Sequence, residues 1–198
     1  METLISGAII GILTSLAVWL LTCRILVPKI TFAQKIAKTQ YSDNEFVYYI
    51  KFQNKGWRDI IDIFVYCTLT IKGIDRNSPE ITDFVSIPMG SMGNNIPRLS
   101  REREEENIKG LRQCKINISN FDTFPVHKFS DEINEKYKNG TLSLEDLLSL
   151  DKSAEMKFGI LGTDIFSGAR KYIESKPFSI NDIVEGSYMK DSLDILEK

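Results

Sequence analysis

The sequence is poor in the residues that most often carry chemistry. Among its 198 residues there is one histidine, His127, and there are three cysteines, Cys23, Cys67 and Cys114. No Cys-x-x-Cys, His-Glu-x-x-His or Gly-x-Ser-x-Gly pattern occurs. Zinc sites and hydrolase nucleophiles commonly use those patterns. We therefore expect no catalytic residue, no metal site and no cofactor, and we predict that the protein is not an enzyme.

An excess of charge of one sign is also missing. The 25 basic and 27 acidic residues leave a formal net charge of −2. Such a balance provides no overall positive field for DNA or RNA, so we expect neither as a partner. Hydrophobic residues make up 42% of the chain and aromatic residues 10%, which argues against disorder. The composition therefore indicates a folded domain.

The longest uncharged run of the chain, residues 3–23, lies between Glu2 and Arg24. About 21 residues at ~1.5 Å each match the ~30 Å hydrocarbon core of a bilayer, so we predict one transmembrane helix. Lysine and arginine follow this run and do not precede it. The positive-inside rule then places the N-terminus outside and the C-terminal domain in the cytoplasm. The sequence predicts a single-pass protein of the bacterial inner (cytoplasmic) membrane.

Small residues recur every four positions within this run, at Gly7, Gly11 and Ser15. They fall on one helix face, where small side chains let two backbones approach closely. We predict self-association, and hence a homo-oligomer, through this face. The alternative is that small residues are simply common in membrane helices.

Residues 28–186 carry a β pattern. Apolar residues alternate over residues 46–53 and 60–72, as strands with one buried face require. In the second segment, Ile61, Ile63 and Val65 begin the face that we expect to be buried. Two short helices are expected over residues 130–138 and 143–150. We predict a mainly β, immunoglobulin-like sandwich with two inserted helices, one transmembrane helix before it (residues 1–27) and a tail (residues 187–198).

Cys67 and Cys114 are expected on inward faces of this sandwich. They are placed like the inter-sheet cysteine pair of immunoglobulin domains. The cytoplasmic placement favours two buried free thiols instead.

Two basic clusters are the candidate binding residues. Lys55, Trp57 and Arg58 lie in a turn between two strands, and Arg98, Arg101 and Arg103 form the second cluster. If both met at one end of the domain, they would hold an anion such as a nucleotide phosphate, with the indole stacking on a base. One alternative is that Trp57 closes the core while Arg58 pairs with a surface acid. Another places Lys55 and Arg58 against anionic lipid headgroups.

Three segments resemble a known group of proteins: Pro28-Lys29-Ile30, residues 54–63 (NKGWRDIIDI) and residues 164–168 (DIFSG). The chain is similar to uncharacterised bacterial single-pass membrane proteins with a β-rich cytosolic domain. A more distant likeness is to effectors of bacterial antiviral signalling that join membrane spans to a β domain. Those effectors usually carry two spans, whereas this sequence predicts one. The resemblance implies a fold and a placement, and no catalytic residue.

The function that we predict is therefore non-enzymatic binding. The β domain binds a protein partner or a small nucleotide, the transmembrane helix contacts membrane lipid, and copies associate through that helix. The alternative is a nucleotide-gated, membrane-perturbing effector in antiphage defence.

Overall fold

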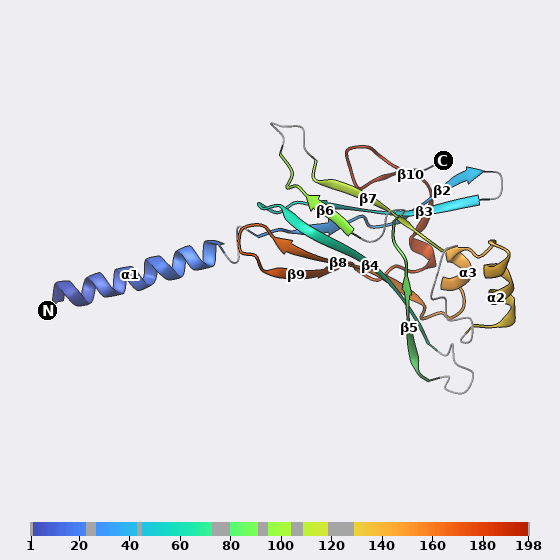
Figure 1. Ribbon diagram of the computed structural model, residues 1–198, viewed down its shortest axis with the longest axis horizontal. Helices are drawn as coiled ribbons and strands as arrows, with labels where there is room; N and C mark the ends of the chain where they lie inside the picture. Colours follow the sequence, from blue (N-terminus) through green and yellow to red (C-terminus); the bar gives the residue numbers. More distant parts are fainter. Residues whose placement is uncertain are drawn as a thin grey trace.

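The computed structural model describes residues 2–22, 27–42, 45–72, 80–90, 95–103, 109–118 and 129–197. Figure 1 shows a long N-terminal helix that stands away from a β-rich domain. The elements are α1 (Glu2–Leu20), β1 (Ile30–Phe32), β2 (Ile36–Ser42), β3 (Glu45–Asn54), β4 (Ile60–Lys72), β5 (Thr82–Ile87), β6 (Asn95–Leu99), β7 (Leu111–Ile116), α2 (Asp131–Lys138), α3 (Leu144–Leu148), β8 (Glu155–Asp164), β9 (Arg170–Glu174), η2 (Ile180–Asp182), β10 (Ile183–Tyr188) and β11 (Ile195–Glu197).

Two sheets form the domain. The first has the order β1-β3-β2-β10-β11, with β7 also paired to β3, and the second has the order β5-β4-β8-β9, with β6 also paired to β4. Buried residues of both sheets, such as Ile50 and Phe52 of β3 and Leu69 of β4, belong to one hydrophobic cluster. An isolated bridge between Met89 and Ile116 links the ends of β5 and β7. The mainly β prediction is confirmed.

The prediction of a transmembrane helix is wrong. No helix in the described parts of the chain has both the length and the apolar character needed to cross a membrane. Helix α1 ends at Leu20, so its uncharged part, residues 3–20, is about 27 Å long, less than the ~30 Å bilayer core. Three further predictions depended on that span: a single-pass protein, its placement in the inner membrane and its orientation there. The same finding contradicts all three.

The sheet arrangement also differs from the predicted immunoglobulin-like sandwich. Strand β10 lies parallel to β2, with Ile183 opposite Ile36, and β11 extends the same sheet. Immunoglobulin sheets have three to five mainly antiparallel strands, whereas this sheet has six. Residues 187–198, predicted as a tail, contain the end of β10 and all of β11. Two short helices are present as predicted, α2 and α3.

A bulge near the start of β4 alters the predicted core. The register with β8 shifts between Ile61 and Phe64, and Asp62 lies in the left-handed region with φ of 49°. Beyond the bulge, every second residue is buried as the alternation predicts. Before it, the alternation reverses, so Ile60 is buried and Ile61 is only partly covered. Aspartate tolerates this backbone conformation better than most residues.

Strand β3 is more deeply buried than alternation predicts, since neighbours cover both of its faces. Lys51 is buried, and its Nζ donates to the carbonyl oxygens of Met189 (2.6 Å) and Lys190 (2.9 Å). Gln53 is also buried and donates to the carbonyl of Lys109 at 2.9 Å. These covering segments are distant in sequence, which explains why a local pattern indicated a strand with one exposed face.

The two described cysteines are free thiols, as predicted. Cys67 is fully buried in β4, and Cys114 is half-buried in β7. Burial raises the pKa of both thiols, for Cys114 to about 11, so both stay protonated and unreactive near neutral pH.

Candidate functional site

The two predicted basic clusters meet at the end of the β domain that adjoins α1. Asp59, which directly precedes β4, lies between them. We call this surface the arginine tip and define it by the predicted residues together with two aspartates and one phenylalanine. Its members are Lys55, Trp57, Arg58, Asp59, Arg98, Arg101, Arg103, Asp164 and Phe166.

Asp59 organises one half of the arginine tip. Its carboxylate is 5% exposed and accepts hydrogen bonds from Arg98 through both Nε (3.0 Å) and Nη2. The backbone N–H of Arg101 donates to the other carboxylate oxygen at 2.7 Å, and Nη2 of Arg103 lies 3.8 Å away. Burial alone raises the pKa of Asp59, but these donors and charges outweigh it and lower the pKa. The carboxylate is therefore ionised and holds the arginine cluster in place.

Asp164 organises the other half from the end of β8. It accepts from Nη1 of Arg58 at 3.2 Å, from the Ser167 hydroxyl at 2.7 Å and from the backbone N–H of Phe166 at 3.2 Å. Asp164 thus caps its own hairpin turn. The guanidinium carbon of Arg58 lies 4.1 Å from the centroid of the Phe166 ring. Burial opposes ionisation, yet the net shift lowers the pKa of Asp164.

The turn after β3 places Trp57 and Arg58. Asn54 accepts from the backbone N–H of Gly56 at 3.0 Å and donates to the carbonyl of Arg58 at 2.8 Å. A Cβ on Gly56 would lie 2.6 Å from the Pro28 Cα and closer still to backbone atoms of residues 27 and 29. Glycine is needed here because the chain entering from α1 passes directly against the turn.

Trp57 does not close the core, which was one alternative. It is 61% exposed, and its carbonyl accepts from Nη1 of Arg101 at 3.3 Å. Arg58 does pair with an acid, but that acid is the buried Asp164 and not a surface residue. The arginine tip therefore combines restrained cations with an exposed indole. Sequence reasoning named the cations and missed both aspartates, although each lies within a segment that it singled out.

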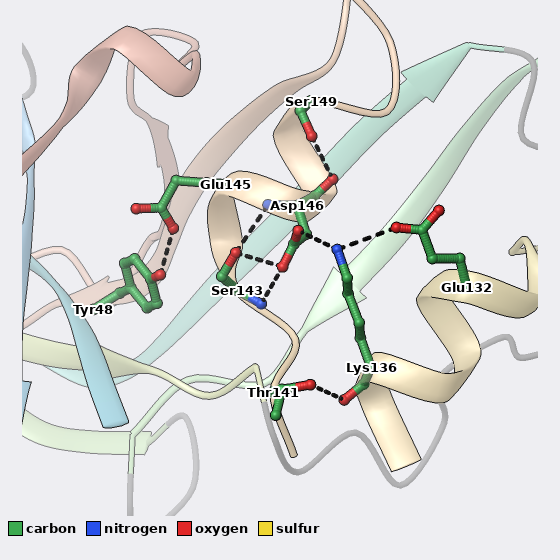
Figure 2. Close-up of polar contacts among 8 residues, drawn as sticks. All are labelled: Tyr48, Glu132, Lys136, Thr141, Ser143, Glu145, Asp146 and Ser149. Atoms are coloured by element: carbon green, nitrogen blue, oxygen red, sulfur yellow. Dashed lines mark hydrogen bonds and ion pairs between the residues drawn. The ribbon is translucent and has the colours of Figure 1, made fainter. Parts of the chain in front are cut away.

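A second polar network lies around α2 and α3 (Figure 2). Glu145 accepts from the hydroxyl of Tyr48 and pairs with Nζ of Lys38 at 2.6 Å. Asp146 forms a capping box with Ser143 and pairs with Lys136 at 2.9 Å. A cleft of about 130 Å³ lies beside this network, lined by residues that include Phe46, Lys115 and Thr141. Lys38, Lys136, Glu145 and Asp146 are all paired, so the network fastens α3 to β2, to β3 and to α2.

The described residues contain no group of acidic, histidine or cysteine side chains placed to hold a metal ion. His127 and the glutamates of residues 104–106 lie outside the described residues. Within the described part, the arginine tip remains the best candidate for binding.

The predicted association residues Gly7, Gly11 and Ser15 lie on one face of α1. A Cβ added to either glycine would meet no atom within 4 Å. The Ser15 hydroxyl donates to the Gly11 carbonyl at 2.8 Å, and Thr14 donates likewise to Ile10. Because their hydrogen-bonding needs are met within the helix, this face is effectively apolar.

No family model matches the chain, and no curated protein matches it either. The resemblance to bacterial proteins noted from the sequence therefore stays a prediction.

Proposed function

We propose that this chain is a non-enzymatic binding protein whose copies associate through α1, while the β domain carries the binding surface. The observation that supports this most directly is the surface of α1. Ten large apolar side chains of residues 5–21 are exposed, among them Ile12, Leu16 and Trp19. Apolar surface of this extent favours burial, and α1 extends away from its own domain, which offers no cover (Figure 1).

The amount of exposed surface suits association between copies. The ten exposed side chains lie on several sides of the helix, so more than one neighbouring copy is needed to cover them. No charged side chain lies in residues 3–22 to oppose the packing of identical helices. A second copy is the occupant that these features favour.

The small residues give the association a preferred face. Helices approach most closely where side chains are small, and close approach increases van der Waals contact along both backbones. Gly7 and Gly11 provide open space on that face. We expect this face of each helix to receive the bulky side chains of another copy.

The test measures the association of the full chain by analytical ultracentrifugation over a range of protein concentrations. We expect a concentration-dependent oligomer, and we expect Gly7→Ile or Gly11→Ile to weaken association at least tenfold by filling the close-packing face. Ala17→Ile is the matched control, because it adds similar bulk to the same helix about 120° away from that face at ~100° per residue.

Two results would contradict the proposal. One is association that neither glycine substitution weakens. The other is a chain that stays monomeric at all concentrations and instead cosediments with vesicles of neutral phospholipid, which would assign the apolar surface of α1 to lipid.

A further inference from the structure

The arginine tip carries more positive charge than its own carboxylates neutralise. It contains five cations and two buried aspartates, and Glu102 is the only other acid among residues 95–103. Among these described residues an excess of two positive charges remains, on a chain whose overall charge is −2. Such an excess in a confined region attracts anions by raising their local concentration.

The aspartates also restrain the arginines. Asp59 holds Arg98 through two nitrogens, yet 54% of that side chain stays exposed. Arg101 is held at its backbone N–H by Asp59 and at its guanidinium by the carbonyl of Trp57. Restrained guanidinium groups lose less conformational freedom when they bind than free surface arginines do. The tip is thus pre-organised for an anion, and it differs in this from an ordinary solvated run of charge.

Two exposed aromatic rings lie beside these cations. Trp57 is 61% exposed and adjoins Arg101 through its backbone carbonyl. Phe166 is 69% exposed and stacks on Arg58. Exposed aromatic rings next to arginines are suited to ligands that combine negative charge with a flat, weakly polar part.

We propose that the arginine tip binds small anions that carry two or more linked phosphate groups. Guanidinium groups match the geometry of phosphate oxygens, and several guanidiniums spread over the tip require more than one anionic group for a full match. A ligand with a single carboxylate matches the tip less well, because it offers only one anionic group and Asp59 already pairs with Arg98 in that way. This inference names a ligand class for the β domain, and it rests on the proposed role of that domain as the binding part.

Two probes separate the sources of such phosphates: inorganic triphosphate, which offers charge alone, and ATP, which adds a base. Both are titrated into the full chain by calorimetry at low salt without divalent cations. Trp19 and Trp57 are the two tryptophans of the sequence, so Trp57 fluorescence is followed in a Trp19→Phe background. We expect saturable binding of triphosphate that weakens as salt rises, because screening reduces the attraction.

Arg101→Gln is the decisive variant. It removes the guanidinium but keeps the backbone N–H that holds Asp59, so the fold around Asp59 is preserved. We expect at least tenfold weaker binding of both probes. Lys138→Gln, at the end of α2 on the far side of the domain (Figure 1), removes the same charge and should leave affinity unchanged.

The two probes then identify the source. Equal affinities for triphosphate and ATP assign the tip to phosphate alone. If ATP binds more tightly, and its affinity falls to that of triphosphate in Trp57→Ala, the tip is assigned to a nucleotide. The absence of triphosphate binding, or equal effects of Arg101→Gln and Lys138→Gln, would overturn the proposal. Gly7→Ile separates this test from the previous one, because it alters association through α1 and leaves the tip intact.

Discussion

Asp59 is the residue on which the end of the domain next to α1 depends. A buried carboxylate is costly unless donors surround it, and here the Arg98 side chain and the Arg101 backbone N–H donate to it while Arg103 adds a nearby positive charge. The same contacts that make it tolerable fix the arginines of β6 and of the segment that follows. One acidic residue therefore links the stability of the domain to the geometry of its candidate site.

Asp59→Asn should reduce the free energy of unfolding by about 2 kcal/mol at neutral pH, because a neutral amide leaves the guanidinium charges near it uncompensated. The pKa of Asp59 is lowered in the folded state, so the unfolded chain binds more protons as the pH falls below ~4. The contribution of the carboxylate is present above that range and is lost as the pH falls through the folded pKa. The difference between wild type and variant should therefore shrink on acidification.

Urea unfolding at a series of pH values measures this difference. Asp62→Asn is the matched control, because Asp62 is exposed and asparagine also accepts its left-handed backbone. A difference that stays constant from pH 7 to pH 3 would show that the carboxylate charge of Asp59 contributes nothing.

At the scale of elements, the short helix α3 is held by side chains and not by its own length. Five residues form too few backbone hydrogen bonds to be stable alone. Its capping box satisfies the first turn, and the pair of Glu145 with Tyr48 and Lys38 attaches it to the first sheet. Desolvation by burial, followed by the hydrogen bond to Glu145, raises the pKa of the Tyr48 hydroxyl, so it remains a donor at all ordinary pH values.

A double-mutant cycle with Tyr48→Phe and Glu145→Gln should give a coupling free energy of about 1–2 kcal/mol, since the two groups share a partly buried, charge-assisted hydrogen bond. Thermal or urea unfolding of the four proteins provides the measurement. Ser149→Ala, which removes an exposed hydroxyl bonded to the carbonyl of Asp146, should cost less than about 0.5 kcal/mol. Additive effects of the first two substitutions would rule out a direct contribution of the pair.

Alternation along the chain was sufficient to predict β3 and β4 because the side-chain period of a strand is local. It was not sufficient to predict which of Ile60 and Ile61 is buried, since the bulge at Asp62 shifts the period by one residue. It also missed the burial of Lys51, whose covering segment follows 138 residues later. Burial that depends on segments distant in the sequence cannot be predicted from the local residue pattern.

The candidate site was predictable in the same partial way. The basic residues form two visible clusters in the sequence. The sequence alone did not determine whether the two clusters meet at one end of the domain. The two aspartates that bring them together were not selected, because an acid beside an arginine is ordinary in any sequence. The uncharged N-terminal run predicted a helix correctly and a membrane span wrongly, since the composition of the run does not determine where its helix ends.

For the whole molecule, α1 and the β domain behave as separate parts. The hydrophobic cluster is built from β-domain residues and contains none from α1. A fragment of residues 27–198 should therefore unfold cooperatively, with a midpoint within about 3 °C of that of the full chain, in circular dichroism melts. It retains Val27, whose carbonyl accepts from Trp57. A fragment without a cooperative transition would show that α1 contributes to the domain after all.

The distribution of side-chain size around α1 has a consequence for symmetry. At ~100° per residue, the face centred on Gly11 and the face formed by Ile5, Ile9, Ile12 and Leu16 lie roughly 130° apart. If the small face of one helix receives the bulky face of the next, each copy has two unlike neighbours and its interface is not self-complementary. Contacts of that kind close into rings or continue as filaments, and they do not stop at two-fold dimers. The number of copies would then follow from the angle between the two faces of a single helix.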